Sequence, residues 1–222
     1  MDEDFSKEYI DDVPSTPVWR GSDYLLFYGK GSVKWEYDSS SQTFVHTNNP
    51  YSLYGYYFVT DATPTNDMTS VAQASGASTR ITTYDDYLLH EQELVSVNQS
   101  GREFFGEDFS GARPRTISTF SSIPGITGAD GKVTMRFISR INSGSGTASL
   151  SINDSELLDI TIPSIQTVSS NVRSYTKAIP GTTTALWKGS KSEKNNVVVS
   201  YSSSGHTNVR LDYIRMQFVR TL

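Results

Sequence analysis

Short runs in which apolar and polar residues alternate recur along most of the chain. The clearest run follows residue 130, where Val133, Met135 and Phe137 alternate with the polar Thr134 and Arg136. Successive side chains of a strand point to opposite faces, so a period of two predicts a strand with one buried face. The same pattern predicts strands in the segments 33–37, 43–46, 79–84, 147–152, 158–162, 172–179, 184–187 and 197–201.

Two further runs are apolar without alternation. They are YLLFY at residues 24–28 and YYFV at residues 56–59. Uninterrupted apolar runs of this length are typical of strands that are covered on both faces. Residues 61–78 are small and polar, which predicts a loop or an irregular edge. In the segment 85–108, a short helix and a bent strand around residues 88–97 both remain open, with a loop after them.

The last apolar run changes phase. Val209 and Leu211 occupy odd positions, whereas Ile214, Met216 and Phe218 occupy even ones. A slip of one residue would turn the second half of the strand away from the core, unless an extra residue is accommodated. We therefore expect a β-bulge near Tyr213–Ile214.

Many short strands, closely spaced turns and almost no helical periodicity indicate an all-β protein. The fold class we expect is an antiparallel β-sandwich, jelly-roll-like, with long irregular loops. We expect residues 1–20 to form an irregular N-terminal segment and residues 21–222 to form the sandwich. A subdivision near residues 110–116 stays open.

Composition and charge narrow the function classes. The chain has 222 residues, a net charge of −5 and a sequence pI near 5.2. Nucleic-acid binding needs a basic surface, which is not evident in this sequence, and an anionic membrane surface would repel the chain. The sequence holds no apolar run of the roughly 20 residues that a membrane helix needs. The acidic N-terminus lacks the features of a signal peptide, so the protein is either cytoplasmic or exported with a leader outside these residues.

Catalytic and metal-binding residues are poorly supported. The chain has no cysteine, which excludes a thiol nucleophile and a disulfide within these residues. His46, His90 and His206 are far apart, and we interpret them as single surface or turn residues rather than zinc ligands. Neighbours such as His90 and Glu91 would point to opposite faces of a strand. The acidic stretches 2–4, 11–12 and 85–86 do not match an EF-hand loop. Taken together, these observations lead us to expect no catalytic residue, metal or cofactor in this chain.

The most unusual polar cluster is formed by Arg102, Glu103, Glu107 and Asp108. It could be a binding loop in which Arg102 grips a carboxylate. Alternatively, Arg102 pairs with one of the three acids while the aromatic residues of the loop anchor it, and we favour this structural interpretation. Those aromatic residues are Phe104, Phe105 and Phe109.

The three tryptophans offer a second candidate for binding. Trp19, Trp35 and Trp187 could form a platform on which sugars stack. Aromatic residues at alternating strand positions are more often core residues or cross-strand pairs.

Four stretches resemble one known family and keep its order along the chain. They are DDVPSTPVWRGSDYLLFYGKGSVKW at 11–35, FVHTNNPYSLYGYYFVTD at 44–61, LLHEQELVSVNQSGREFFGEDF at 88–109 and VRLDYIRMQFVRTL at 209–222. The family that they resemble is PorU, the gingipain-like cysteine peptidases, or sortases, of the type IX secretion system of Bacteroidota. Phe104 stands where the family pattern has Trp, and Gln92-Glu93 departs from its acidic spacing.

The resemblance implies a place and a role. Family members are cell-surface, outer-membrane-associated enzymes that remove the C-terminal sorting domain of exported cargo and help attach the cargo to an anionic lipopolysaccharide. Their catalytic Cys and His lie in a later domain, so no catalytic residue is carried over onto this chain. We therefore expect a non-catalytic domain ahead of the peptidase domain of an exported surface protein. Its partners would be that adjacent domain, and secretion-system components or cargo.

Two alternatives remain. The first is a carbohydrate- or protein-binding module of an exported bacterial surface protein. The second is an independent hydrolase, for which the sequence offers no nucleophile with an evident base.

Overall fold

The fold is seen in a computed structural model of the chain. It describes residues 15–61, 67–72, 75–76, 78–97, 101, 103–141, 143–165, 178–189, 191–205 and 207–222. The chain divides into two compact units, residues 1–80 and residues 81–222, which we call unit 1 and unit 2. The domain bounds expected from the sequence, 1–20 and 21–222, stay a prediction.

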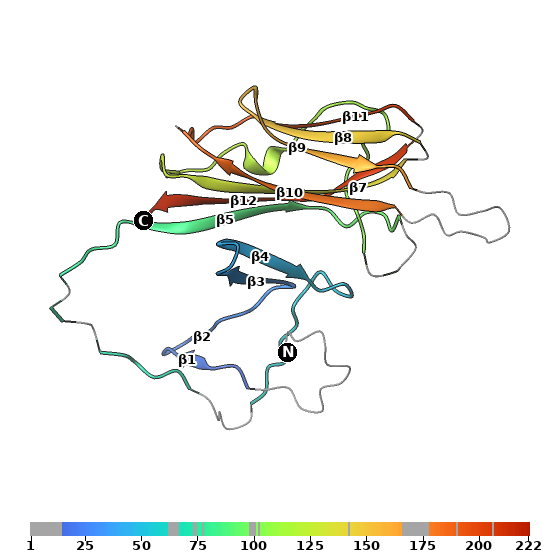
Figure 1. The fold of residues 1–222 in the computed structure, drawn as a ribbon. Coiled ribbons are helices and arrows are strands. Elements are labelled where there is room, and N and C mark those ends of the chain that lie inside the picture. The colour runs from blue at the N-terminus through green and yellow to red at the C-terminus, as the bar shows by residue number, and fades with distance from the viewer. Residues whose placement is uncertain are drawn as a thin grey trace. The chain divides into compact units, whose positions relative to one another are not determined.

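Unit 2 is built from two antiparallel four-stranded sheets, with the orders β10-β7-β12-β5 and β6-β11-β8-β9 (Figure 1). This arrangement confirms the predicted all-β sandwich. Its elements are β5 (Thr83–Glu91), β6 (Arg115–Thr116), the 3-10 helix η1 (Ser118–Phe120), β7 (Gly131–Ile141), β8 (Ser145–Ile152), β9 (Ser155–Pro163), β10 (Ile179–Trp187), β11 (Val197–Ser203) and β12 (Thr207–Thr221).

The main core of unit 2 contains the inward faces of both sheets. Val133, Met135 and Phe137 of β7 are fully buried in the same cluster as Leu150 of β8 and Val199 of β11. The alternation predicted for these strands is thus confirmed. At the edge where β10 approaches β9, Gly181 leaves room for the other sheet. A Cβ at that position would lie 2.6 Å from Cγ2 of Ile160, so a larger residue would push the two strands apart.

The predicted bulge in the last strand is confirmed. The pairing of β12 with β7 shifts between Leu211 and Tyr213, which makes Asp212 the extra residue. Leu211 and Ile214, on the two sides of the shift, are both fully buried. The bulge therefore lets both halves of the longest strand face the core.

Four strand predictions need correction or completion. The strand predicted at 79–84 begins only at Thr83. The unclear segment after residue 85 continues β5 as a strand to Glu91, so no helix forms there. Residues 56–59 do not form a strand and lie largely at the surface. Of the strand predicted at 172–179, residues 172–177 lie outside the described residues, and β10 begins at Ile179.

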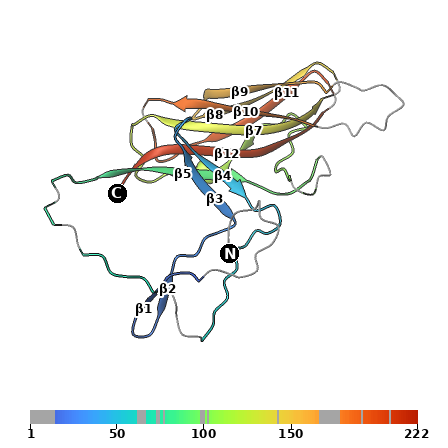
Figure 2. The same ribbon diagram turned by 60° about the horizontal axis from the view of Figure 1, so that its bottom comes forward.

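The described part of unit 1 contains two hairpins (Figures 1 and 2). Strands β1 (Val18–Arg20) and β2 (Leu25–Phe27) form one, and β3 (Val33–Asp38) and β4 (Thr43–Asn48) form the other. Serine side chains fix the turn after β3, since Ser40 and Ser41 each donate a 2.6 Å hydrogen bond to the Asp38 carboxylate. These bonds, the one from Ser40 first, lower the pKa of Asp38 to about 2.

The prediction that the run 24–28 is covered on both faces is wrong for the chain as described. Leu25, Leu26 and Phe27 are each about half exposed, at 53%, 56% and 47%. Every buried hydrophobic side chain found in the described residues lies between Val97 and Phe218, within unit 2. Among the described residues, no helix has the length and apolar character needed to cross a bilayer.

Candidate functional site: the polar loop of unit 2

Within the polar loop, which we define as residues 101–110, residues 106–109 lie along the edge of the first sheet, β10-β7-β12-β5. β5 pairs with β12 only from Tyr213 onward. Earlier along β12, the amide of Gly106 donates to the carbonyl of Leu211 at 2.8 Å, and the amide of Phe109 donates to the carbonyl of Val209 at 2.8 Å. The loop thus takes the place beside β12 that β5 has left.

Two phenylalanines fix the loop on opposite faces of the first sheet. Phe109 lies in the main core, with its ring centroid 5.2 Å from that of Phe137. Phe105 is fully buried in a separate small cluster, which also holds Val97, Ile138 and Ala178. Phe104 is only half-buried. Two of the three predicted aromatic anchors are therefore buried.

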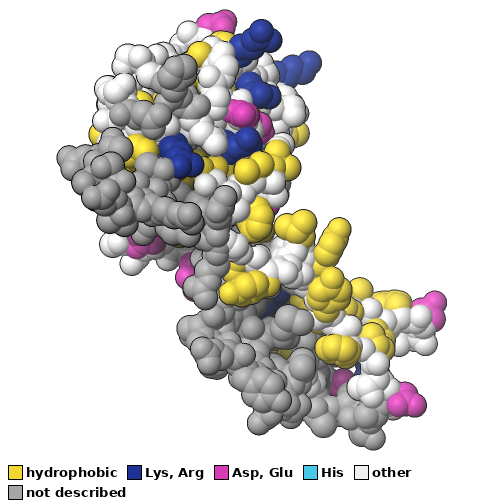
Figure 3. Space-filling model, turned by 90° about the vertical axis from the view of Figure 1, so that its right-hand side faces the viewer, with side chains coloured by type: hydrophobic (Ala, Val, Ile, Leu, Met, Phe, Trp, Pro, Cys, Tyr) yellow, Lys and Arg dark blue, Asp and Glu magenta, His cyan; other side chains and the backbone are white. Residues whose placement is uncertain are grey.

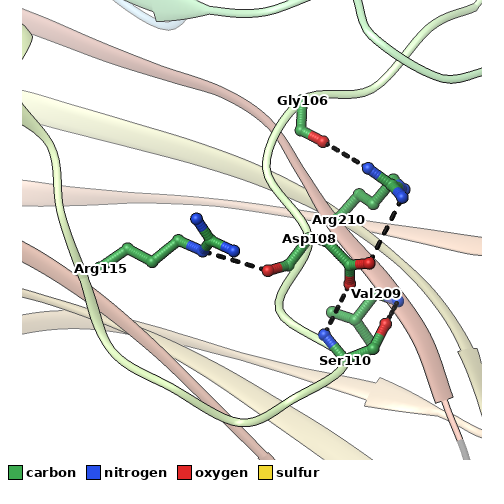
Figure 4. Close-up of polar contacts among 6 residues, drawn as sticks. All are labelled: Gly106, Asp108, Ser110, Arg115, Val209 and Arg210. Atoms are coloured by element: carbon green, nitrogen blue, oxygen red, sulfur yellow. Dashed lines mark hydrogen bonds and ion pairs between the residues drawn. The ribbon is translucent and has the colours of Figure 1, made fainter.

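Asp108 is held by both side chains and backbone (Figure 4). Its carboxylate accepts a 2.8 Å hydrogen bond from the amide of Ser110 and forms a 3.4 Å ion pair with Arg210. Arg210 also donates to the carbonyl of Gly106 at 2.9 Å, and Arg115 donates to the carbonyl of Asp108 at 3.1 Å. Burial raises the pKa of Asp108, but the bonds from Ser110 and the two arginines outweigh it, so that the pKa lies below its ordinary value.

Glu107 joins three elements through His90. Nε2 of His90, on β5, lies 2.7 Å from Oε1 of Glu107, and Nδ1 lies 2.7 Å from the Thr119 hydroxyl of η1. Since an ionised carboxylate only accepts, Nε2 donates the hydrogen in the contact with Glu107. Burial raises the pKa of Glu107, but the hydrogen bond from His90 and the other favourable contacts lower it below its ordinary value.

Arg136 connects the loop to the bulge. It forms a 3.1 Å ion pair with Glu103 and a close ion pair with Asp212. Asp212 is 5% exposed. Burial raises the pKa of Asp212 to about 6, with Glu91 and Glu103 adding to the rise, although Arg136 opposes it. The bulge therefore places a carboxyl group with a raised pKa beside the arginine that also binds Glu103 of the loop.

The sequence analysis singled out the acidic residues of the loop but not the residues that they contact. Arg102 lies outside the described residues, and Glu103, Glu107 and Asp108 contact residues of β7, β5 and β12. A role of the four residues in ligand binding stays a prediction. His90 is not a single surface or turn histidine, as the sequence analysis expected, but a strand residue whose side chain is 11% exposed. Sequence spacing gave no signal for its partners, which are 17 and 29 residues away.

The hydrogen-bonded residues Thr119, His90 and Glu107 are of the types that serve as nucleophile, base and acid in a catalytic triad. In the Ser-His-Asp arrangement the acid binds Nδ1 and the hydroxyl binds Nε2, and donors must also stabilise an oxyanion. Here the two ring contacts are exchanged, and the His90 ring lies edge-on to the buried Phe120 at 6.3 Å. We interpret the cluster as a brace between β5, the polar loop and η1.

Other residues singled out in the sequence are dispersed. Trp187 is buried, Trp35 is half-buried beside His46, and Trp19 is 42% exposed. Asp86 forms an ion pair with Arg220 at 2.8 Å. His206 and the acidic stretches 2–4 and 11–12 lie outside the described residues. Within the described ranges, no three His, Asp or Glu side chains come together as a metal site.

Comparison with solved structures finds a similarity that covers the whole chain. No family model and no curated protein sequence matches the chain. Among solved structures, dimeric latent PorU from Porphyromonas gingivalis matches over 100% of this chain, with 30% identity and a TM-score of 0.74. Carbohydrate-binding modules from Cellvibrio mixtus lichenase 5A and from the laminarinase LamC of Zobellia galactanivorans match less well. They are 13% and 12% identical, cover 49% and 59% of this chain and 66% and 98% of their own, and have TM-scores of 0.26 and 0.30.

The PorU match has a sequence identity and a TM-score high enough to carry an argument, whereas the TM-scores of the two modules are too low for one. The chain spans 21% of the length of that PorU chain. It is therefore similar, along its whole length, to one segment of a much longer PorU polypeptide.

Proposed function

We propose that this chain is a non-catalytic β-sandwich region of a PorU-like surface sortase, a cysteine peptidase that processes cargo of the type IX secretion system. The observation that carries the proposal is the match to PorU over the full chain at a TM-score of 0.74. The four stretches that resemble the family lie at residues 11–35, 44–61, 88–109 and 209–222, in both units. In this proposal the parent protein is exported and associated with the outer membrane at the cell surface.

The chemistry of the chain supports a structural role. Without a cysteine, these 222 residues cannot supply the nucleophile of a cysteine peptidase. The polar loop uses its acids for contacts within unit 2, through His90, Arg136 and Arg210. We propose that the region packs against the peptidase domain of the same polypeptide and helps to shape the approach of cargo or of other secretion components.

A peptidase assay tests the proposal. The isolated 222-residue chain should not cleave a sorting-domain substrate, whereas the whole polypeptide should, and substitution of its catalytic cysteine should abolish the activity. Turnover by the isolated chain that disappears with His90→Ala or Thr119→Ala would contradict the non-catalytic assignment, because those residues form the triad-like cluster.

The alternative is a carbohydrate- or protein-binding module. The exposure of Trp19 and of several tyrosines in unit 1 favours it, since exposed aromatic rings can stack on sugars. Specific binding of a glycan by the isolated chain, lost with Trp19→Ala and retained with Tyr84→Ala, would support this alternative. Tyr84 is a suitable control because it is 40% exposed in unit 2.

A further inference from the structure

The hydrophobic surface of unit 1 is the largest feature that the proposed function leaves unexplained. Tyr28, Tyr51, Leu53, Phe58 and Val59 are between 70% and 86% exposed. Figure 3 shows hydrophobic side chains standing at the surface of this unit, in the lower half of the view. A soluble protein rarely exposes so many large apolar side chains unless they contact a partner. We call residues 24–28 and 51–59 together the unit 1 apolar surface.

Strand β2 contributes Leu25, Leu26 and Phe27 to this surface. Leu25 and Phe27 lie on one face of the strand and Leu26 lies on the other, because side chains alternate along a strand. All three are about half exposed, although such a run is typical of a strand covered on both sides. A two-stranded hairpin such as β1–β2 is only marginally stable in water by itself. The sequence of β2 therefore fits the interior of a larger β-structure.

The two segments of the surface are connected. The rings of Phe27 and Tyr57 lie 5.2 Å apart, and the hydroxyl of Tyr57 donates to the carbonyl of Lys30 at 3.2 Å. Gly55 allows the closest approach, since a Cβ there would lie 2.5 Å from the carbonyl oxygen of Lys30. Residues 51–59 thus lie against the chain that follows β2, and a single partner can cover both segments.

The similarity to PorU indicates where the partner comes from. The whole of this chain corresponds to 21% of the length of the solved PorU chain, so most of such a polypeptide lies outside these residues. We propose that the unit 1 apolar surface is covered by β-structure from another part of the same polypeptide, which packs on both faces of β2 and adds a strand to its edge. This inference rests on the proposed function and adds the surface through which the region docks.

Hydroxyl-radical footprinting of the whole polypeptide and of the isolated 222-residue chain tests the inference. Labelling of Phe27, Tyr28 and Tyr54 should fall about fivefold or more in the whole polypeptide, since interface cores are fully desolvated. Hydrogen exchange of the peptide 24–28 should slow by a similar or larger factor. Labelling of Tyr84, in unit 2, is the internal control.

A variant pair separates docking from a general loss of structure. In the whole polypeptide, Leu26→Lys should restore labelling of Tyr54, whereas Leu186→Lys should not. Leu186 is a matched control because it is 50% exposed on β10. Unchanged thermal unfolding of unit 2 in both variants would show that the sandwich remains folded.

Four outcomes would overturn the inference in different ways. Equal labelling of the whole polypeptide and of the isolated chain would reject the docking surface and leave the proposed function intact. Protection of the isolated chain that grows with its concentration would assign the surface to a second copy instead. Protection by added glycans would assign it to carbohydrate. A native polypeptide without a peptidase domain would reject the proposed function as well.

Discussion

The pKa values of two carboxyl groups of unit 2 shift in opposite directions, although burial raises both. Glu107 gains enough from His90 to remain ionised at lower pH than usual, whereas burial raises the pKa of Asp212 to about 6. The difference lies in their partners. Glu107 accepts from a ring that also binds Thr119, while Asp212 shares Arg136 with a second carboxylate, Glu103. The two residues therefore make opposite contributions to the pH dependence of stability.

Replacing Asp212 should flatten the stability profile between about pH 4 and pH 6. A pKa of about 6 in the folded state exceeds the ordinary 3.8, so the folded state holds the extra proton in this range. The free energy of unfolding then falls as pH rises, by about 2–3 kcal/mol over the range. Urea denaturation of Asp212→Asn should lack this contribution, and the control Asp159→Asn, an exposed carboxyl on β9, should keep it. An equally steep profile in Asp212→Asn would contradict the assignment.

Removing the Glu107 side chain should destabilise unit 2 more than removing that of Glu103. Glu107→Ala deprives His90 of its carboxylate inside the brace and should cost about 1–3 kcal/mol. Glu103→Ala is the matched control, because its side chain is 50% exposed and such ion pairs contribute less than about 1 kcal/mol. The Glu107 contribution should disappear as pH falls below about 4.5, since its pKa is lowered on folding. Equal losses in the two variants would argue against the brace.

At the scale of elements, the sequence predicts strands with one buried face. It does not predict which residues the polar loop contacts. The phase change between Leu211 and Ile214 located the bulge, because alternation reports directly which face is buried. The partners of the polar loop were beyond reach, since Glu103 and Arg136 are brought together only by the packing of the loop on the sheet. The run YYFV was mistaken for a strand because hydrophobicity alone does not supply a neighbouring strand to pair with.

The polar loop should depend on Phe105 more than on Phe104. Phe105→Ala would open a cavity in the cluster with Val97 and Ile138 and should cost about 3–5 kcal/mol. Phe104→Ala, at a half-buried position, should cost about 1 kcal/mol. Thermal unfolding of both variants checks the difference. Similar midpoints would mean that Phe105 does not anchor the loop through its cluster with Val97 and Ile138.

At the scale of the whole molecule, the described parts of the two units differ in their buried hydrophobic residues. The buried hydrophobic residues found in the described part of the chain all belong to unit 2. Many large apolar residues in the described part of unit 1, including the three of β2, are exposed instead. The sequence predicted that residues 24–28 are covered on both faces, whereas Leu25, Leu26 and Phe27 are about half exposed in the described chain.

A fragment of residues 81–222 should therefore unfold cooperatively by itself. Calorimetry should give it a single transition with a midpoint close to that of the main transition of the full chain, because the core cluster is retained. A fragment of residues 1–80 should show no cooperative transition, since hairpins without a core are marginal. Loss of the transition in fragment 81–222 would contradict the division into units.

The mass of the native polypeptide tests the central claim most directly. An antiserum against residues 81–222 would isolate the protein from its own cells, and intact-mass measurement with peptide mapping would follow. The account predicts a polypeptide several times heavier than the 24.6 kDa of this chain, with a cysteine- and histidine-containing peptidase domain after residue 222. A polypeptide of about 24.6 kDa, without such a domain, would contradict it.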